Sequence, residues 1–435
     1  MISTGVMAAV LVLLLALLFF GVPVPFSFFG VSILLVYLGG YDTSFLLPYG
    51  YTKVSSYVLL AIPLFIMAGG IIERSNMGEK LVNFVELFVG KVKGSLGVVA
   101  VVSCAIFGAI SGSAAATQSV IGSIMWPRME AAGYSKGKSA ALIASSCLLG
   151  GMIPPSGLMI IYAWTAQVSV LQCFLATLIP GIIMAVMFSV AFVIMLRNDE
   201  GVQVLEAGSR KEYFQIAKKR TWDAIPALLF PVIILGGIYG GYMTATEAAA
   251  VSVVYAVLVG FLIYRQLKLR SLGSVLVETA TTTGVIMIML FMVMMLSRLL
   301  IMEDVPGMFL DLVTSISTNK YVILIMVNIF MIIIGMLMDD VSSVLLCTPL
   351  LMPIMQSIGI SPIQFASIIC VNISLGCVTP PCAPLLYLAS RLSNTPVSAM
   401  LKPTLQLIIF VWLPALLMVT FIPELSLILP GFIAK

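Results

Sequence analysis

The sequence contains no histidine, and charged residues make up only 9% of it. Zinc sites of the usual type and catalysis by Ser-His or Cys-His pairs are therefore excluded or nearly so. Its seven cysteines all lie in apolar sequence and form no CxxC pair, so we interpret them as buried free thiols. These absences argue against an enzyme.

Long apolar runs are what the sequence has in abundance. Hydrophobic residues make up 61% of the chain, and apolar runs of about 17 residues or more recur from end to end. No cleavable signal peptide is apparent, because the first apolar run, 5–21, has no basic segment before it. The composition predicts an all-α polytopic membrane protein embedded in a lipid bilayer.

Eleven residues recur 226 positions later without a gap, and several of them are residues that break membrane helices. The pairs are Pro127/Pro353, Met129/Met355, Gly133/Gly359, Ser135/Ser361, Ala140/Ala366, Ile143/Ile369, Leu149/Leu375, Gly150/Gly376, Pro154/Pro380, Pro155/Pro381 and Ala163/Ala389. Two homologous halves that are interrupted at the same place are typical of secondary transporters. We therefore expect the substrate site where the breaks of the two halves meet.

The apolar segments divide the chain into parts. They are 5–21, 26–39, 57–72, 96–126, 138–165 and 171–196 in the first half, and 226–242, 246–264, 275–302, 321–352, 362–390 and 403–423 in the second. Segments 96–126 and 321–352 are too long for one span and rich in small and polar residues, which predicts re-entrant hairpins. We expect scaffold and arm helices in 1–95 and 223–320, a transport domain made of 96–196 and 321–402, a basic cytoplasmic linker at 197–222 and a C-terminal helix in 403–435.

The basic residues indicate how the two halves are oriented. If the linker 197–222 is cytoplasmic, counting spans places the basic stretches 91–93, 128–138 and 265–270 in the cytoplasm as well. The loop after the second hairpin, 353–362, carries no charge and falls outside. The loops that follow the two hairpins, 128–138 and 353–362, are equivalent in the two halves. An odd number of spans separates them, so they lie on opposite sides of the membrane and the repeats are inverted. A hairpin that crosses the membrane twice returns the chain to the same side as a re-entrant hairpin does. The positions of the charges therefore do not distinguish these two kinds of hairpin.

Each hairpin carries a run of residues suited to binding. The first contains Ser111-Gly112-Ser113-Ala114-Ala115-Ala116-Thr117-Gln118-Ser119, whose oxygens could hold Na⁺ and whose small side chains could simply allow a close helix contact. The second contains Asp339 and Asp340, with Asp339 226 positions after Ser113. Two adjacent carboxylates in an apolar stretch need water, a partner or a cation, unless one of them caps the second helix of the hairpin.

Paired prolines interrupt both halves, within Gly150–Ser156 and Gly376–Pro381. Such prolines free carbonyls upstream, which attract cations, and start a new half-helix, whose N-terminal amides attract a carboxylate. Ten residues past Pro381, Arg391 is either a snorkelling anchor or a counter-ion for a substrate carboxylate. Three other charged residues are not assigned to the site: Glu247, Glu278 and Arg298.

Six short runs, in this order and spacing, resemble the large membrane subunit of TRAP transporters, the DctM-like permeases, over essentially the whole chain. They are SGSAAAT (111–117), IPPS (153–156), ATEAAA (245–250), GMLMDD (335–340), TPLLMP (348–353) and GCVTPP (376–381). The resemblance implies Na⁺-coupled uptake of an organic anion, usually a carboxylate such as a C4-dicarboxylate or a sugar acid like sialic acid. It also implies a periplasmic solute-binding protein, a small four-helix membrane subunit, an elevator movement and a bacterial inner-membrane location.

In this family the sodium and substrate sites lie at hairpin tips and helix breaks, so the resemblance implies two groups of site residues. The candidate sodium ligands are Ser111, Ser113, Gly150, Pro154, Gly335, Asp339, Ser342, Gly376 and Thr379. The candidate substrate-binding residues are Ser111, Gly112, Thr117, Pro155, Ser156, Pro381 and Arg391. The second break departs from the family's usual TPP-x-G, because Thr379-Pro380-Pro381 continues as Cys382-Ala383-Pro384. The extra proline would stiffen this half-helix and reshape the substrate pocket.

Two other functions remain open. Facing hairpins rich in Gly, Ser and Thr could line an ion or organic-anion channel on the same inverted repeat, although broken helices at both positions favour alternating access. An enzyme that uses Asp339 and Asp340 would need a second carboxylate cluster or a histidine, and the sequence offers neither. No four-helix segment precedes the first span, so we expect the small subunit to be a separate chain.

Overall fold

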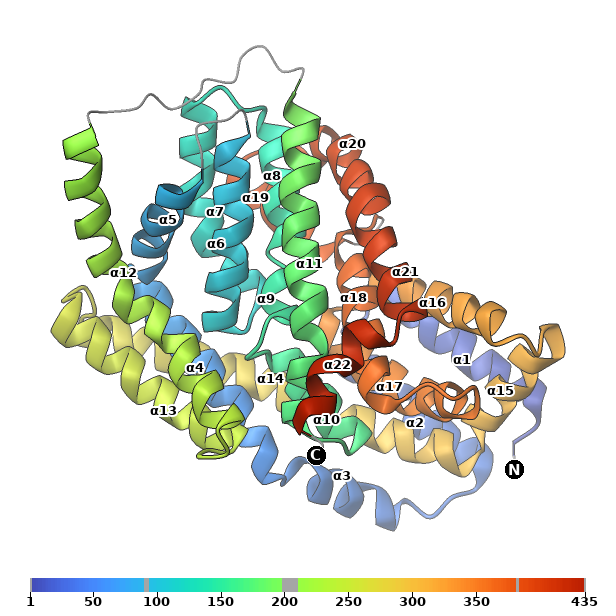
Figure 1. The fold of residues 1–435 in the computed structure, drawn as a ribbon. Coiled ribbons are helices and arrows are strands. Elements are labelled where there is room, and N and C mark those ends of the chain that lie inside the picture. The colour runs from blue at the N-terminus through green and yellow to red at the C-terminus, as the bar shows by residue number, and fades with distance from the viewer. Residues whose placement is uncertain (1, 90–93, 198–209, 381–382, 434–435) are drawn as a thin grey trace.

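The computed structural model describes residues 2–89, 94–197, 210–380 and 383–433, and all regular structure within them is helical (Figure 1). The first half contains α1 (Thr4–Phe19), α2 (Val24–Gly39), α3 (Leu46–Val54), α4 (Ala61–Arg74), α5 (Met77–Phe88), α6 (Ser95–Ser111), α7 (Ala114–Ala131), α8 (Lys136–Ser146), α9 (Leu149–Met152), α10 (Gly157–Ala166) and α11 (Val170–Leu196). The second half contains α12 (Arg210–Tyr239), α13 (Ala245–Leu258), α14 (Leu269–Met302), α15 (Val305–Ile316), α16 (Lys320–Leu337), α17 (Asp340–Ser357), α18 (Pro362–Val378), α19 (Pro384–Ser393), α20 (Val397–Leu407), α21 (Leu413–Phe421) and α22 (Glu424–Ile433).

The helix boundaries repeat with the same offset as the sequence. Helix α6 ends at Ser111 and α7 begins at Ala114, and α16 and α17 do so 226 positions later, at Leu337 and Asp340. We call α6–α7 hairpin 1 and α16–α17 hairpin 2. The two hairpins approach the middle of the molecule from different sides (Figure 1). The predicted all-α fold of two inverted repeats, each with a helical hairpin and a broken helix, is confirmed.

Each hairpin turns over two residues. In hairpin 1, Gly112 adopts a left-handed conformation (φ 63°), and Ser113 caps α7 by accepting a hydrogen bond from the Ala116 amide at 3.4 Å. In hairpin 2, Asp339 caps α17 by accepting a hydrogen bond from the Ser342 amide at 3.3 Å. Side chains thus satisfy amides at the tips, as irregular backbone at membrane depth requires.

The paired prolines interrupt a helix in both halves. In the first, residues 153–156 separate α9 from α10, and the direction of the chain bends by 47° between Lys136–Met152 and Gly157–Ala166. In the second, α18 ends at Val378 and α19 begins at Pro384, with Pro381 and Cys382 outside the described residues. The breaks lie where the sequence predicts them.

Pairs of glycines bring each hairpin against its broken helix. A Cβ on Gly108 of α6 would lie 2.2 Å from the Cα of Gly150, which is closer than real side chains approach. In the second repeat, a Cβ on Gly376 would lie 2.4 Å from the carbonyl carbon of Gly335. Only glycine permits backbone contact this close.

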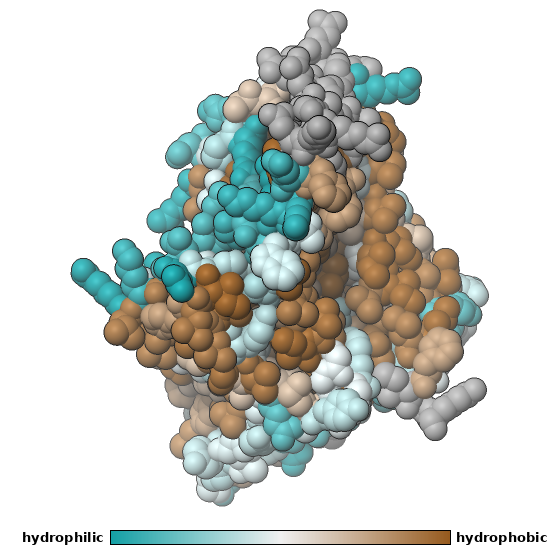
Figure 2. All heavy atoms as spheres, turned by 60° about the vertical axis from the view of Figure 1, so that its left-hand side comes forward, coloured by the Kyte–Doolittle hydropathy of each residue, from teal (hydrophilic) through white to brown (hydrophobic). Residues whose placement is uncertain are grey.

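Seven helices of the described residues are long and apolar enough to cross a membrane, or up to eight if the bent pair counts as one span. On α11, Ile182, Val186, Val190 and Ile194 recur every fourth residue, and each is more than half exposed. Such a stripe is favourable against lipid and unfavourable against water. Figure 2 shows a broad apolar band on one face, with hydrophilic residues gathered above it.

Two features differ from the expected segments. Three short amphipathic helices, α3, α5 and α15, are not among the apolar segments expected from the sequence, because their apolar residues are spaced along one face and not in a run. Helix α12 begins at Arg210, so the second part of the stretch 197–222, expected as a linker, is helical.

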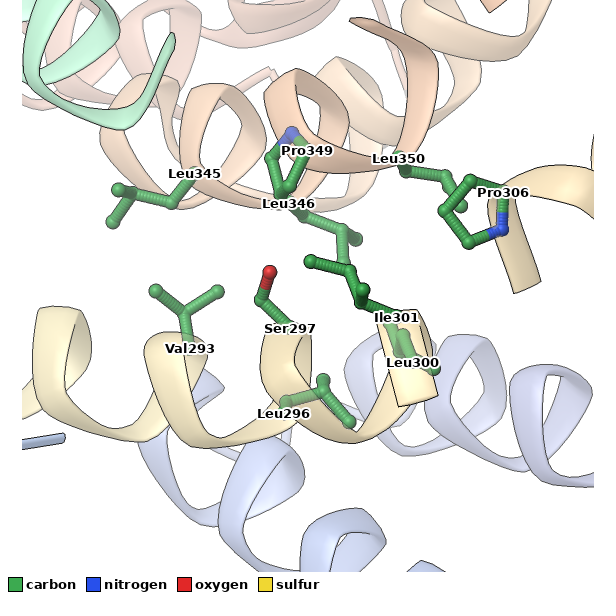
Figure 3. A pocket seen from close by; sticks show the side chains of 10 residues that line it. All are labelled: Val293, Leu296, Ser297, Leu300, Ile301, Pro306, Leu345, Leu346, Pro349 and Leu350. Atoms are coloured by element: carbon green, nitrogen blue, oxygen red, sulfur yellow. The ribbon is translucent and has the colours of Figure 1, made fainter. Parts of the chain in front are cut away.

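Helices α14 and α17 meet at an almost wholly apolar contact (Figure 3). Around a cavity of about 10 Å³, Val293 and Leu300 of α14 lie across from Leu345 and Pro349 of α17, and Ser297 contributes the polar group. A space this small holds at most one water molecule. The contact therefore links hairpin 2 to α14 with little hydrogen bonding.

Glu86 of α5 joins three helices by ion pairs. Its carboxylate lies 2.8 Å from the guanidinium of Arg220 on α12 and 3.8 Å from that of Arg128 on α7. Arg220 also donates a hydrogen bond to the Asn83 carbonyl at 3.3 Å. This cluster connects the base of hairpin 1 to α5 and α12.

We expect Gly376→Ala to lower the thermal unfolding temperature of the purified protein. The added Cβ would overlap the Gly335 backbone, at a cost of roughly 1–3 kcal/mol. Gly284→Ala is the matched control, because nothing lies within 4 Å of a Cβ on Gly284 of α14. Equal unfolding temperatures of the two variants in the same detergent would show that the close approach is not needed.

Candidate functional site

A cavity of about 470 Å³ lies at the tip of hairpin 1. Its walls come from the tip itself (111–116), from residues on both sides of the first break, and from Asp340 and Val341 of hairpin 2. Helices α4 and α14 supply the remaining wall, and α19 contributes Leu388. Elements of both repeats therefore meet at one cavity, where the sequence places the substrate.

Uncharged oxygens gather behind the tip of hairpin 1. The Ser111 Oγ lies 3.1 Å from the Thr117 Oγ1, and both hydroxyls donate to the Ser113 carbonyl, at 3.3 and 2.7 Å. Gly150 of the broken helix is next to them, since a Cβ there would lie 2.9 Å from the Thr117 Oγ1. Of the predicted residues, the structure brings Ser111, Ser113, Thr117 and Gly150 together.

The first break lies against the same tip. A Cβ on Gly112 would lie 3.2 Å from the Pro155 carbonyl oxygen. Ser156 caps α10 by accepting a hydrogen bond from the Met159 amide at 3.4 Å, and its hydroxyl donates to the Gly151 carbonyl at 2.5 Å. Gly112, Pro155 and Ser156, all predicted to bind substrate, are therefore neighbours at the cavity.

Pro154 is not among the residues that line the central cavity. It lines a separate apolar cavity of about 590 Å³ between α6, α11 and α12, together with Ile153. Its role as a sodium ligand stays a prediction.

In the second repeat the predicted residues form two smaller groups. Gly335 contacts Gly376 through the backbone, and the Ser342 hydroxyl donates to the Asp339 carboxylate. The Thr379 hydroxyl donates to the carbonyl four residues earlier, at 2.6 Å. The Asp339 side chain thus serves as a helix cap, the alternative that the sequence leaves open, and Asp340 is the one that reaches the cavity.

Ser343 is a candidate that is not among the predicted residues. Its hydroxyl is buried and has no hydrogen-bond partner in the described part of the chain. Ser343 stands 226 positions after Thr117, so the internal repeat could have identified it as the equivalent of a predicted residue. A buried hydroxyl without a partner is expected to meet a ligand, ion or water.

Arg391 and Pro381 are the remaining predicted residues, and two glutamates join the cavity without having been predicted. Arg391 lies in the last turn of α19, is exposed, and is not among the residues that line the cavity. Pro381 lies outside the described residues. Glu278, left unassigned on sequence grounds, lines the cavity from α14, as does Glu73 from α4.

The groups available for an ion are hydroxyl and carbonyl oxygens. Among the described residues, no three Cys, Asp or Glu side chains converge in a way that could hold a metal ion. Neutral oxygens at helix ends suit a monovalent cation, whereas divalent ions prefer several carboxylates. The residues at the tip of hairpin 1 therefore fit Na⁺ better than Mg²⁺ or Ca²⁺.

Comparison with known proteins gives a consistent set of relatives. A family model described as "Tripartite ATP-independent periplasmic transporter, DctM component" matches residues 11–425. The chain is 32% identical to the sialic acid TRAP transporter large permease protein SiaM of Vibrio cholerae, with 96% of each chain covered. It is 33% identical to the C4-dicarboxylate TRAP transporter large permease protein DctM of Pseudomonas aeruginosa, with 87% of each covered.

Two further similarities concern length and fold. The isethionate TRAP transporter permease protein DctMQ of Oleidesulfovibrio alaskensis is 32% identical over 94% of this chain, which spans 64% of that protein. Among solved structures, the YdaH transporter of Alcanivorax borkumensis superposes with a TM-score of 0.63 at 14% identity, covering 87% of this chain and 88% of that one. At this identity the likeness concerns the fold alone.

Proposed function

Because the chain belongs to the DctM family of tripartite ATP-independent periplasmic (TRAP) transporters, we propose that it carries an organic acid across the bacterial inner membrane together with Na⁺. The family consists of transporters and not enzymes, and the resemblance of the six sequence runs is confirmed. The observation that carries the proposal is the central cavity, where hairpin 1, the first break and Asp340 of hairpin 2 meet. A site at the junction of inverted repeats is typical of secondary transporters.

The relatives indicate the partners and the class of substrate. Permeases of this family work with a small membrane subunit and a periplasmic binding protein. We expect the small subunit of this transporter to have four helices and the binding protein to deliver the load. The names of the relatives specify sialic acid, C4-dicarboxylates and isethionate, all organic acids, which supports an organic acid here.

Coupling to Na⁺ is supported by the donor set. Ser111, Ser113, Thr117 and Gly150 place hydroxyl and carbonyl oxygens within a few ångströms of one another beside a helix break. Ser343 stands 226 positions after Thr117, and its buried hydroxyl has no partner in the described residues. We therefore assign Ser343, together with Ser342, to a second sodium site near the cap of hairpin 2. When bound, Na⁺ would supply charge that balances the substrate's acid group.

The membrane potential limits the stoichiometry. Each inward Na⁺ gains about 2.3 kcal/mol per 100 mV, and each negative charge on the substrate loses the same amount. A singly charged acid is therefore driven inward by two Na⁺. A dicarboxylate needs more than two for electrogenic uptake.

We propose that the hairpins and broken helices move against α14 as an elevator. The contact of α17 with α14 is apolar around Val293, Leu345 and Pro349, so sliding would break few hydrogen bonds (Figure 3). The hairpins are held to their broken helices by backbone contact at Gly108 and Gly376, so they would move together. Rigid movement of one bundle past another is how inverted-repeat transporters alternate their access.

The test of this function is uptake into proteoliposomes that hold the chain with its small subunit. Organic acids loaded on the binding protein are supplied with and without an inward Na⁺ gradient. We expect saturable uptake that needs both the binding protein and Na⁺. Uptake of free solute that ignores Na⁺ would instead indicate a channel.

We expect Ser343→Ala to raise the Na⁺ concentration that gives half-maximal uptake by roughly three- to tenfold, the effect of losing one ligand oxygen. Ser357→Ala, near the other end of α17, is the control, because its hydroxyl donates only to the Ile354 carbonyl. The readout is initial uptake rate against Na⁺ concentration. An unchanged half-maximal concentration in Ser343→Ala would remove Ser343 from the sodium site.

A further inference from the structure

Within the described residues, the charged side chains that line the central cavity are all acidic. Glu73 belongs to α4, Glu278 to α14 and Asp340 to hairpin 2. Glu278 lies 3.5 Å from the guanidinium of Arg74, and Asp340 accepts a hydrogen bond from the Val341 amide at 2.9 Å. Glu73 is the one of the three that makes no hydrogen bond or ion pair in the described part of the chain: the positive charge of Arg74 acts on it, but the Arg74 guanidinium is paired with Glu278.

Glu73 lies close to the tip of hairpin 1. Gly69, one turn earlier on the same face of α4, lies so near the tip that a Cβ there would be 3.1 Å from the Ser111 carbonyl oxygen. One helical turn places Glu73 roughly 6 Å farther along the axis. Its side chain is only partly exposed, so an unpaired carboxylate there is costly unless a cationic group comes to it.

A second group without a partner lines the cavity from α14. Thr279 is 8% exposed and makes no hydrogen bond with any described residue. Helix α14 lies against α4 at this level, because a Cβ on Gly70 would be 3.0 Å from the Val275 Cγ1. A hydroxyl without a protein partner that faces the cavity and a nearby carboxylate are the groups that receive an N–H-bearing cation.

The other part of the cavity suits an acid group. The tip of hairpin 1 and the start of α10 present helix N-termini, capped by Ser113 and Ser156, and helix N-termini attract anions. The cavity thus offers hydroxyls and helix N-termini at the tip of hairpin 1 and the first break, and a carboxylate without a hydrogen bond or ion pair about one helical turn beyond the Gly69 contact with that tip. This arrangement complements a molecule that carries both signs of charge.

We infer that the cavity takes a zwitterion, a small organic acid that also carries a cationic nitrogen, and that Glu73 and Thr279 recognise the nitrogen. The inference rests on the proposed function and narrows its substrate class. A second carboxylate in place of the nitrogen would face Glu73, and like charges at such a site are rejected. The permease therefore discriminates against plain mono- and dicarboxylates.

The first experiment measures binding of free solutes to the purified complex of this chain with its small subunit. The probes are 4-aminobutanoate, a zwitterion, and its matched acids butanoate and butanedioate, together with shorter and longer homologues of each. A ligand that binds the folded state raises the unfolding temperature. In Na⁺, the zwitterions should raise it at lower concentrations than the matched acids. A preference for the acids, or no shift with any zwitterion, would overturn the inference.

The second experiment removes the charge of Glu73. Glu73→Gln keeps the shape of the side chain and should weaken the apparent affinity for the best zwitterion about tenfold or more. It should leave the matched monocarboxylate unchanged, because that acid has no charged group to face Glu73, and should not weaken the matched dicarboxylate. Glu79→Gln on α5, outside the cavity, is the control and should bind like the unaltered protein. Unchanged zwitterion affinity in Glu73→Gln would overturn the inference. A higher Na⁺ requirement would also overturn it, since Glu73 would then be a sodium ligand.

Uptake separates failure of this inference from failure of the transporter function. If the complex with its binding protein takes up no solute in a Na⁺ gradient, the proposed function itself fails. If it takes up nitrogen-free acids, and Glu73→Gln leaves that uptake unchanged, the transporter stands and the zwitterion inference fails.

Discussion

Close contact between the backbone of each hairpin and its broken helix is the constraint on which the site depends. A hairpin that ends at membrane depth has amides and carbonyls that neither lipid nor water satisfies, so it must be buried against protein. Gly108 with Gly150 and Gly335 with Gly376 permit that burial without an intervening side chain. The close contact of Gly108 with Gly150 also places Gly150 beside the Thr117 hydroxyl. The packing of hairpin 1 and the clustering of oxygens at its tip therefore have one cause.

The two repeats meet the same geometric need with different chemistry. Ser113 and Asp339 stand 226 positions apart, and each caps the second helix of its hairpin. The Asp339 carboxylate therefore has a structural role as a cap, and its role as a sodium ligand stays a prediction. The unpaired oxygens are more informative, because capping does not account for the buried hydroxyl of Ser343 or the carboxylate of Glu73.

The fold could be predicted from the sequence because glycine and proline mark its interruptions. The repeat of Gly150, Pro154 and Pro155 places the breaks, and the length of 96–126 indicates a turn within it. The short amphipathic helices could not be found among apolar runs. The wall formed by Glu73 and Glu278 could not be predicted either, because it depends on how far-separated helices α4 and α14 line up beside the hairpin.

The ion pairs of Glu86 have a consequence for how conformations are populated. The carboxylate lies 2.8 Å from Arg220 of α12, and Arg128 at the base of hairpin 1 is the more distant partner at 3.8 Å. If hairpin 1 moves relative to α12, Glu86 keeps its closer partner and is not left isolated. A partly exposed pair such as Glu86–Arg128 contributes at most about 1 kcal/mol. This contact therefore opposes such a movement only weakly, so binding of the proposed substrate and ions would be enough to change which position is occupied.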